Sequence, residues 1–340
     1  MSKRKLTRRQ AWRVNKVQED RVKRANQRSD RIDRQINEGE LGSEQQGLVI
    51  AHYGNQVDIE SQRKDSPGEI SRCHMRSNLG TLVTGDRVIW MPGNPTGVVI
   101  ASLDRESELS RPDNHGTLRP IAANIDYIVI VLAPLPQPYA NLIDRYLVAA
   151  ESVNIEPLIL LNKVDLINND NRAEIEKLLS IYPKIGYRVL EASTQSMDGL
   201  NELKSVLKNR TSVFVGQSGV GKSSLINVLL PGVDIKVGGL SKGRDKGTHT
   251  TTTAKLFHFP DGGDLVDSPG IREFGLWHME REEVLDGFIE FRPHIGACKF
   301  RNCKHQSEPG CQVLSALERG EISQRRLDSF ESIARSLEML

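Results

Sequence analysis

Cysteine is scarce in this chain, with only four among its 340 residues. Three of them, Cys298, Cys303 and Cys311, fall within fourteen residues, which excludes a disulfide framework distributed over the fold. Together with His305 they give the spacing Cys-x4-Cys-x-His-x5-Cys, which offers three thiolates and one imidazole. This is a closed tetrahedral set for one structural zinc ion, and it leaves no ligand position for water. Buried or redox-active cysteines are the competing interpretation.

Long hydrophobic runs are also missing. The longest, 128–133 with its flanks, is far shorter than the roughly 20 residues that a membrane-spanning helix needs, so we expect no membrane partner. No apolar segment of the kind found in secretory signals follows the basic start. The acids Glu19, Asp20, Asp30 and Asp33 are unusual for an organelle transit peptide. We therefore expect a cytoplasmic protein.

The net charge of only +2 conceals an asymmetry between the two parts of the chain. Residues 1–36 hold 13 lysines and arginines against 4 acids, a balance of +9, and the remainder carries −7. A basic arm suits a polyanion such as RNA, because its cations displace counterions from phosphates. The alternative is a solvated tail whose charge only maintains solubility. Either way, residues 1–45 lack the apolar positions for a core and are predicted to be disordered on their own.

Residues 46–112 show short β-like runs separated by turn residues. The expected strands are 47–52, 57–60, 70–75, 86–90 and 97–102. Short strands at this spacing predict a small β-barrel, for which an oligonucleotide-binding (OB) fold is our first choice and an SH3-like barrel the alternative.

Residues 113–279 alternate between apolar strands and helices, which predicts a parallel sheet covered on both faces. The expected strands are 125–133, 157–161, 187–192 and 211–215, with two more around Phe257 and around Leu265 and Val266; the expected helices are 142–153, 172–181, 198–208 and one starting near Lys222. Residues 280–340 are predicted to form a helical C-terminal domain that contains the cysteine cluster and a last helix with Leu327, Phe330 and Ile333.

A phosphate-binding loop follows the strand 211–215. It fits G-x-x-x-x-G-K-[ST] and comprises Gly216, Gln217, Ser218, Gly219, Val220, Gly221, Lys222, Ser223 and the adjacent Ser224. The glycines allow consecutive N–H groups to surround a phosphate at the N-terminus of the next helix. Lys222 supplies a cation for the β- and γ-phosphates, and the Ser223 hydroxyl suits Mg²⁺.

The tetrapeptide Asn162-Lys163-Val164-Asp165 selects the base, and it follows another apolar strand. The Asp165 carboxylate can accept hydrogen bonds from N1–H and the amino group of guanine. Adenine would leave this carboxylate unpaired, at a cost of at least ~1–3 kcal/mol. Lys163 can lie along the base, and Asn162 can tie this loop to the phosphate loop. Ala192 and Ser193, at the end of the next strand, are expected to complete the guanine pocket through backbone N–H groups.

The switch residues are expected after these loops. Asp267 ends an apolar strand, where it can lie near Mg²⁺, and the Gly270 N–H can contact a γ-phosphate. In the Thr-rich stretch 248–253 we choose Thr251 as the second Mg²⁺ ligand, with Thr250 and Thr252 as alternatives.

The water-orienting glutamine that usually follows D-x-x-G is replaced by Ile271, which cannot perform this role. His249 is the candidate catalytic replacement, unless a partner supplies the missing group. In both cases we expect slow GTP hydrolysis alone and faster hydrolysis with a partner.

The motifs occur in an unusual order: the guanine tetrapeptide at 162 precedes the phosphate loop at 216 and the D-S-P-G segment at 267. A compact sheet tolerates such a relocation of its termini, so this order predicts a circularly permuted GTPase.

With its barrel, permuted GTPase motifs and Cys-rich end, the chain resembles the ribosome small subunit-dependent GTPase A (RsgA) family from about residue 47 onwards. The most specific segments are 216–224, 249–252, 267–274 and 298–311. The family more often has Gly-Arg-His where this chain has Gly-Thr-His at 247–249, so a cation beside the switch is absent.

The resemblance implies an OB barrel, hydrolysis dependent on His249, and a zinc-binding C-terminal domain. It further implies a GTPase that acts late in assembly of the small ribosomal subunit, contacting rRNA and ribosomal proteins, and that is stimulated by that subunit. The alternative class is an RNA-binding scaffold in which the nucleotide is structural. We expect a monomer that uses GTP and GDP with Mg²⁺.

Overall fold

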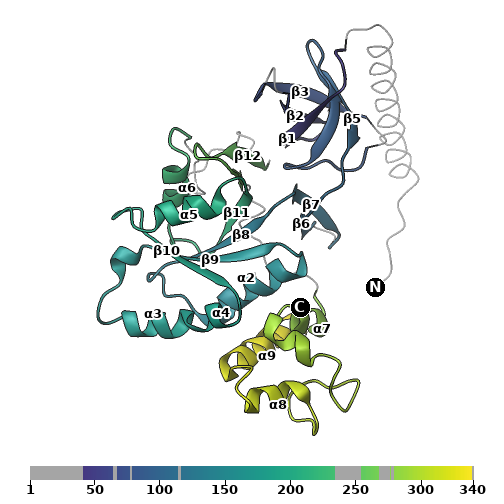
Figure 1. The fold of residues 1–340 in the computed structure, drawn as a ribbon. Coiled ribbons are helices and arrows are strands. Elements are labelled where there is room, and N and C mark those ends of the chain that lie inside the picture. The colour runs from purple at the N-terminus through teal and green to yellow at the C-terminus, as the bar shows by residue number, and fades with distance from the viewer. Residues whose placement is uncertain are drawn as a thin grey trace, which may run out of the picture. The chain divides into compact units, whose positions relative to one another are not determined.

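The computed structural model describes residues 41–63, 67–76, 79–113, 116–233, 254–267, 276 and 279–338. These residues form two compact units that divide between Asp104 and Arg105, and Figure 1 shows the elements of each. Within the described ranges, no helix has the length and apolar character needed to cross a membrane.

The first unit is a closed five-stranded barrel. Its strands are β1 (Gln45–Tyr53), β2 (Gln56–Ser61), β3 (Ile70–Met75), β4 (Arg87–Met91) and β5 (Gly97–Ser102). They pair in the order β1-β2-β3-β5-β4, and β4 pairs with β1 to close the barrel. All pairs are antiparallel except β3 with β5, which is parallel. This is the connectivity of an OB fold, so the first choice from the sequence is confirmed.

Alternation of side chains in the strands builds the core of the barrel. In β2, Val57 and Ile59 are fully buried while their neighbours are half-buried, and in β4 Val88 and Trp90 are buried while their neighbours are half-buried or exposed. At Gly47 of β1, a Cβ atom would lie 2.3 Å from Ile59 Cγ2 and 2.5 Å from Trp90 Nε1. Glycine is therefore required for the strands to approach closely enough to enclose Trp90.

The second unit contains a six-stranded sheet in the order β10-β9-β8-β11-β13-β12. The strands are β8 (Tyr127–Leu132), β9 (Glu156–Asn162), β10 (Arg188–Ala192), β11 (Thr211–Val215), β12 (Lys255–His258) and β13 (Asp264–Asp267). Five strands are parallel, as the apolar runs predict, but β12 pairs antiparallel with β13. A separate hairpin, β6 (Glu108–Pro112) with β7 (Leu118–Ala123), precedes the sheet and is not foreseen by any sequence pattern.

Helices cover both faces of this sheet. They are α2 (Ala140–Ser152), α3 (Arg172–Leu179), α4 (Ile181–Lys184), α5 (Leu200–Leu207) and α6 (Lys222–Leu229). Figure 1 shows α5 and α6 on one face and α2, α3 and α4 on the other. Val129 and Val131 of β8 pack in one core with Leu203 of α5 and Leu225 of α6. The single helix expected over 172–181 is instead the pair α3 and α4.

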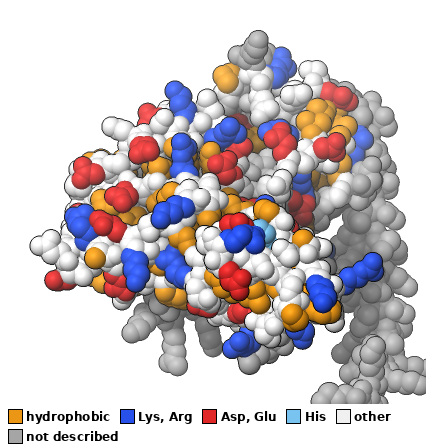
Figure 2. Space-filling model, turned by 60° about the horizontal axis from the view of Figure 1, so that its bottom comes forward, with side chains coloured by type: hydrophobic (Ala, Val, Ile, Leu, Met, Phe, Trp, Pro, Cys, Tyr) orange, Lys and Arg blue, Asp and Glu red, His pale blue; other side chains and the backbone are white. Residues whose placement is uncertain are grey.

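The C-terminal helices belong to the same compact unit as the sheet. They are α7 (Arg281–Asp286), the 3₁₀ helix η3 (Ile289–His294), α8 (Gln312–Glu318) and α9 (Gln324–Glu338). The rings of Phe288, Phe291 and Phe330 have centroids 5.1–5.9 Å apart at the centre of their core. Val148 of α2 lies in this core too, together with the predicted Leu327. The face seen in Figure 2 carries charges of both signs interspersed with hydrophobic side chains.

Candidate functional site

The nucleotide-binding candidates converge because the strands that precede them are parallel. β10, β9, β8 and β11 run side by side, and the residues that follow their ends lie at one edge of the sheet. Asn162 ends β9, Ala192 ends β10, and Gly216 follows β11. Ligands of such sheets bind at this edge.

The backbone of the phosphate loop adopts positive φ angles, which its glycines permit. Gly216, Gly219 and Gly221 have φ angles of +137°, +87° and +91°. A Cβ atom at Gly216 would lie 2.3 Å from the Val131 carbonyl oxygen, and one at Gly221 would lie 2.4 Å from Asn162 Nδ2. Side chains at these positions would push the phosphate loop away from β8 and from the base loop.

Lys222 opens α6 and folds back over the phosphate loop. Its ammonium group donates to the carbonyl oxygens of Gly216 and Gln217, both at 2.7 Å. The cation is thereby held beside the loop, where an anion would enter. Ser223 and Ser224 follow in the first turn of α6, and Ser223 is half-buried.

Two side chains join the base loop to the phosphate loop. Asn162, which is fully buried, donates from Nδ2 to the Val220 carbonyl oxygen at 2.9 Å. Lys163, in a left-handed conformation with φ 59°, donates from Nζ to the Gly219 carbonyl oxygen at 2.6 Å. The base loop (162–165) and the phosphate loop (216–224) therefore form one continuous rim. The hydrogen bond of Asn162 is the link between the two loops that the sequence predicts.

Asp165 projects from this rim with an exposed side chain. The Ser193 hydroxyl donates to Asp165 Oδ1 and accepts from the N–H groups of Gln195 at 3.1 Å and Ser196 at 3.2 Å. Ser193 is fully buried. It therefore orients the carboxylate with its side chain, whereas the sequence predicts only a backbone contact for Ser193. The neighbouring Ala192 is fully buried at the end of β10.

Asp267 is the only switch candidate within the described residues. It ends β13, which is parallel to β11, and so lies at the same edge of the sheet as the phosphate loop. His249, Thr251 and Gly270 lie outside the described residues, as do the alternatives Thr250 and Thr252.

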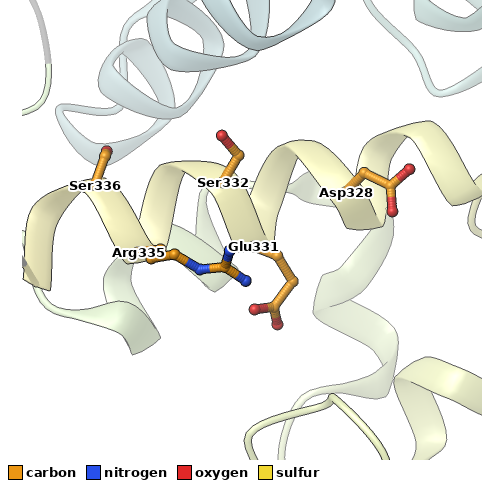
Figure 3. Close-up of a pocket in the computed structure, with 5 residues that line it drawn as sticks. All are labelled: Asp328, Glu331, Ser332, Arg335 and Ser336. Carbon is orange, nitrogen blue, oxygen red and sulfur yellow. The ribbon is translucent and has the colours of Figure 1, made fainter.

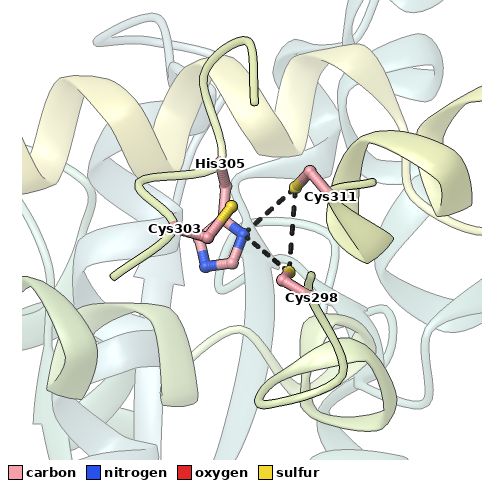
Figure 4. Close-up of side chains that lie close together, drawn as sticks. All are labelled: Cys298, Cys303, His305 and Cys311. Atoms are coloured by element: carbon pink, nitrogen blue, oxygen red, sulfur yellow. Dashed lines mark hydrogen bonds between the residues drawn. The ribbon is translucent and has the colours of Figure 1, made fainter. Parts of the chain in front are cut away.

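The four predicted zinc ligands lie together. Their candidate ligand atoms are all within 4.8 Å of one another. The sulfur of Cys298 is 3.9 Å from that of Cys311 and 3.6 Å from His305 Nδ1, which is 3.3 Å from Cys311 Sγ. Figure 4 shows these contacts, with Cys303 beside the imidazole. Zinc–sulfur bonds of about 2.3 Å at tetrahedral angles place sulfur atoms about 3.8 Å apart, so the set fits zinc.

Backbone donors and burial act on the ligands of the cluster, and burial raises the pKa of the Cys303 and Cys311 thiols. The N–H groups of Gln312 and Leu314, in the first turn of α8, donate to the sulfurs of Cys298 at 3.3 Å and Cys311 at 3.5 Å. Burial lowers the pKa of His305, which favours the neutral form that binds metals. These residues belong to the described ranges, and Cys73, in the barrel, is not part of the cluster.

A surface pocket of about 370 Å³ lies on α9, away from the strand ends that carry the nucleotide candidates. It is lined by Asp328, Glu331, Ser332, Arg335 and Ser336, and Figure 3 shows Glu331 and Arg335 on one side of the helix and Ser332 and Ser336 on the other. Ser336 accepts a hydrogen bond from Arg145 of α2, and Glu331 pairs with Arg281. Ser336 and Glu331 therefore join α9 to α2 and α7.

A parallel sheet with a guanine loop joined to a phosphate loop, in the permuted chain order, defines the class: a circularly permuted P-loop GTPase. The chain belongs to the RsgA GTPase family, whose model matches residues 102–277.

Relatives support this membership over nearly the whole chain. The "Small ribosomal subunit biogenesis GTPase RsgA" of Azotobacter vinelandii is 57% identical over 99% of this chain and 98% of its own length. The protein of the same description from Hahella chejuensis is 56% identical over 99% and 97%.

Two solved structures are also similar. YjeQ from Thermotoga maritima has a TM-score of 0.72 and 32% identity, covering 87% of this chain and 99% of its own. YloQ, described as a circularly permuted GTPase, has a TM-score of 0.70 and 30% identity, with coverages of 87% and 96%. The predicted circular permutation is thereby confirmed.

Proposed function

We propose that this chain is a cytoplasmic GTPase that binds the small ribosomal subunit and acts late in its maturation. The subunit stimulates GTP hydrolysis, and hydrolysis releases the protein. The observation that carries the proposal is the joined rim of the two loops, in which Asn162 and Lys163 hold the phosphate loop while Asp165 stays exposed to a base. The ribosomal setting comes from the names of relatives that are more than half identical to this chain.

The predicted nucleotide-binding residues divide into one set for the phosphates and one for the base. The phosphate-binding set is Gly216, Gln217, Ser218, Gly219, Val220, Gly221, Lys222, Ser223, Ser224, Asp267 and Gly270; the guanine-binding set is Asn162, Lys163, Asp165, Ala192 and Ser193. Backbone N–H groups of the phosphate loop surround the β-phosphate, and Lys222 exchanges its carbonyl partners for phosphate oxygens. Asp165, held by Ser193, accepts two hydrogen bonds from guanine.

Hydrolysis requires a water molecule aligned with the γ-phosphate. Ser223 and Thr251 would hold Mg²⁺, which neutralises charge that develops on the phosphates. His249 orients the water, because Ile271 has no polar group for that purpose. A single imidazole is a weak substitute for a glutamine in this role, so turnover is slow until a partner helps to orient the water.

The zinc site and the basic arm support binding to the small ribosomal subunit. Cys298, Cys303, His305 and Cys311 would hold one structural zinc ion that fixes the chain between η3 and α8. The arm 1–45, the barrel 46–112, the GTPase domain 113–279 and the C-terminal domain 280–340 remain our predicted division. The arm contributes cations for rRNA, and the protein acts as a monomer.

The test is GTP turnover with and without purified small ribosomal subunits. ATP, large subunits and the His249→Ala variant serve as controls. Stimulation that is specific to GTP and to small subunits, and that is lost in the variant, is the expected result. Subunit binding with unchanged turnover would contradict the proposal and favour an RNA-binding scaffold with a structural nucleotide.

A further inference from the structure

The turn that contains Asp165 begins with a residue in an unfavourable backbone conformation. This turn is the 3₁₀ helix η1 (Val164–Leu166), and Lys163 precedes it with a φ angle of 59°. Left-handed backbone is costly for a residue with a Cβ atom, so it persists only where the surroundings hold it. Asn162 and Lys163 hold it on the side of the phosphate loop. Support after the turn has to come from the residues that follow, 167–171.

Asn171 supplies this support. It stands at the N-cap of α3, where an asparagine side chain usually accepts a hydrogen bond from the first turn of its own helix. The Asn171 side chain makes no such bond. Its Nδ2 atom instead donates to the Leu166 carbonyl oxygen at 3.0 Å, and its Oδ1 atom accepts from the backbone N–H of Asn168 at 2.8 Å. Both polar atoms of the amide are therefore directed back to the chain after Asp165.

The Asn171 amide acts on the residue next to the predicted guanine ligand. Leu166 follows Asp165, and its N–H group donates to the Lys163 carbonyl oxygen at 2.9 Å. Leu166 is thus bound through its N–H group to the start of η1 and through its carbonyl group to Asn171. The Asp165 side chain has only two rotatable bonds, so it cannot compensate for a displaced backbone. Recognition of guanine therefore depends on where this turn is held.

Helix α3 is a fixed support for Asn171. Two of its side chains, Ile175 and Leu179, are buried. At its C-terminal end, Arg325 of α9 donates to the Leu178 carbonyl oxygen at 2.8 Å. Carbonyl groups in a last helical turn lack partners inside the helix, so this bond attaches the end of α3 to α9. The helix that presents Asn171 is therefore anchored away from the nucleotide site.

We propose that Asn171 is a positioning residue for base selection: through the Leu166 carbonyl group it holds η1 where Asp165 meets guanine. The inference rests on the proposed guanine site. It concerns the base rather than the phosphates, because among the described residues the Asn171 side chain bonds only to the chain that follows Asp165. The guanine carboxylate is thus supported from α3 as well as from Ser193.

The first test is Asn171→Asp, which is isosteric. The carboxylate keeps an acceptor for the Asn168 N–H group but replaces the donor to Leu166 with a second oxygen atom. Aspartate is as good an N-cap as asparagine, and its charge is favourable at the start of a helix, so α3 should stay intact. The variant therefore removes the hydrogen bond to η1 without weakening the helix.

The readout is the preference for GDP over inosine diphosphate, measured by competition with fluorescently labelled GDP. Inosine lacks the 2-amino group of guanine, so this preference reports how well Asp165 reaches that group. Both ligands have the same diphosphate, so the added negative charge acts on both alike. We expect the preference to fall about threefold to tenfold in Asn171→Asp, with the unfolding temperature of the free chain maintained.

Two further variants complete the experiment. Asn169→Ala is the matched control, because this exposed amide in the same turn has no side-chain hydrogen bond within the described part of the chain, and its preference should be unchanged. Asn171→Ala removes the donor without adding a charge and should reduce the preference as well. An unchanged preference in both Asn171 variants, even with both affinities lowered alike, would overturn the proposal. If the unmodified chain does not prefer GDP, it is the proposed guanine site that fails.

Discussion

The Nδ2 atom of Asn162 lies 2.9 Å from the Val220 carbonyl oxygen and joins two loops that are 58 residues apart. Asn162→Ala removes this hydrogen bond and leaves a buried carbonyl oxygen without its donor. Loss of this hydrogen bond costs about 1–3 kcal/mol. We expect the loss to weaken nucleotide binding, because the bond aligns the two loops before the ligand binds. We expect GDP affinity to fall about tenfold, measured by equilibrium fluorescence titration. The exposed Asn168→Ala, which alters only a local turn, should leave the affinity unchanged.

Asp165→Asn should redirect base preference from guanine to xanthine. The amide keeps an oxygen for the Ser193 hydroxyl and offers an N–H₂ donor to the carbonyl oxygen that xanthine has at C2. Loss of the charge-assisted hydrogen bonds to guanine should weaken GDP binding by about 3 kcal/mol, roughly a hundredfold. Competition between GDP and xanthosine diphosphate measures the change. A variant that loses both ligands equally would contradict the assignment of Asp165 to the base.

Cys298→Ser should remove the metal from the C-terminal cluster. The purified chain is expected to hold about one zinc ion, measured by elemental analysis, and the variant almost none. Because Cys298 and Cys311 lie against the core of Phe288 and Phe330, the unfolding temperature should fall as well. Cys73→Ser is the control, since this buried thiol lies in the barrel and should not affect zinc content. Full zinc retention in Cys298→Ser would refute the ligand set.

Arg326→Met should destabilise the second unit by about 3–5 kcal/mol, because it leaves Asp144 and Glu290 buried without their cation. Arg319→Ala removes an exposed ion pair with Glu321 and should destabilise the chain far less, because water screens the two charges. Chemical denaturation monitored by circular dichroism compares the two. Equal effects would show that the buried network does not anchor α9.

His52 should make the barrel less stable in mild acid. Burial lowers the pKa of His52 below its usual 6.5, although Asp86 opposes the shift. The unfolded chain therefore takes up a proton more readily than the folded one, and the free energy of unfolding falls as the pH drops through 6.5. His52→Gln should reduce this loss between about pH 7.5 and pH 5.5. Parallel pH profiles of the two proteins, from chemical denaturation, would contradict the prediction.

Local signals explain why the strands were predictable. The expected strands 70–75 and 97–102 coincide with β3 and β5, since the turn residues 66–68 and 92–95 directly precede these short segments. The β6–β7 hairpin escaped prediction because Pro120 and a bulge after Leu109 interrupt its alternation. Closure of the barrel between β1 and β4 is a long-range event that no local pattern announces.

Motif spacing located the phosphate and guanine loops because their chemistry requires fixed residues at fixed separations. The contacts that hold these loops and helices in place follow no such motif. Ser193 carries no pattern that marks its hydroxyl for Asp165, and Arg326 lies 182 residues from Asp144 in sequence. A charged residue on an amphipathic helix is normally expected to face water. Only tertiary structure shows that this arginine is buried.

The location of Val148 decides where the chain can be divided. This residue lies on a helix of the nucleotide-binding sheet but is buried in the core of the C-terminal helices. A chain that ended before Arg281 would expose Val148 to water and would leave the Asp144 carboxylate without its partner Arg326. Such a fragment would be prone to aggregate, so its enzymology would report on a damaged helix rather than on an isolated catalytic module.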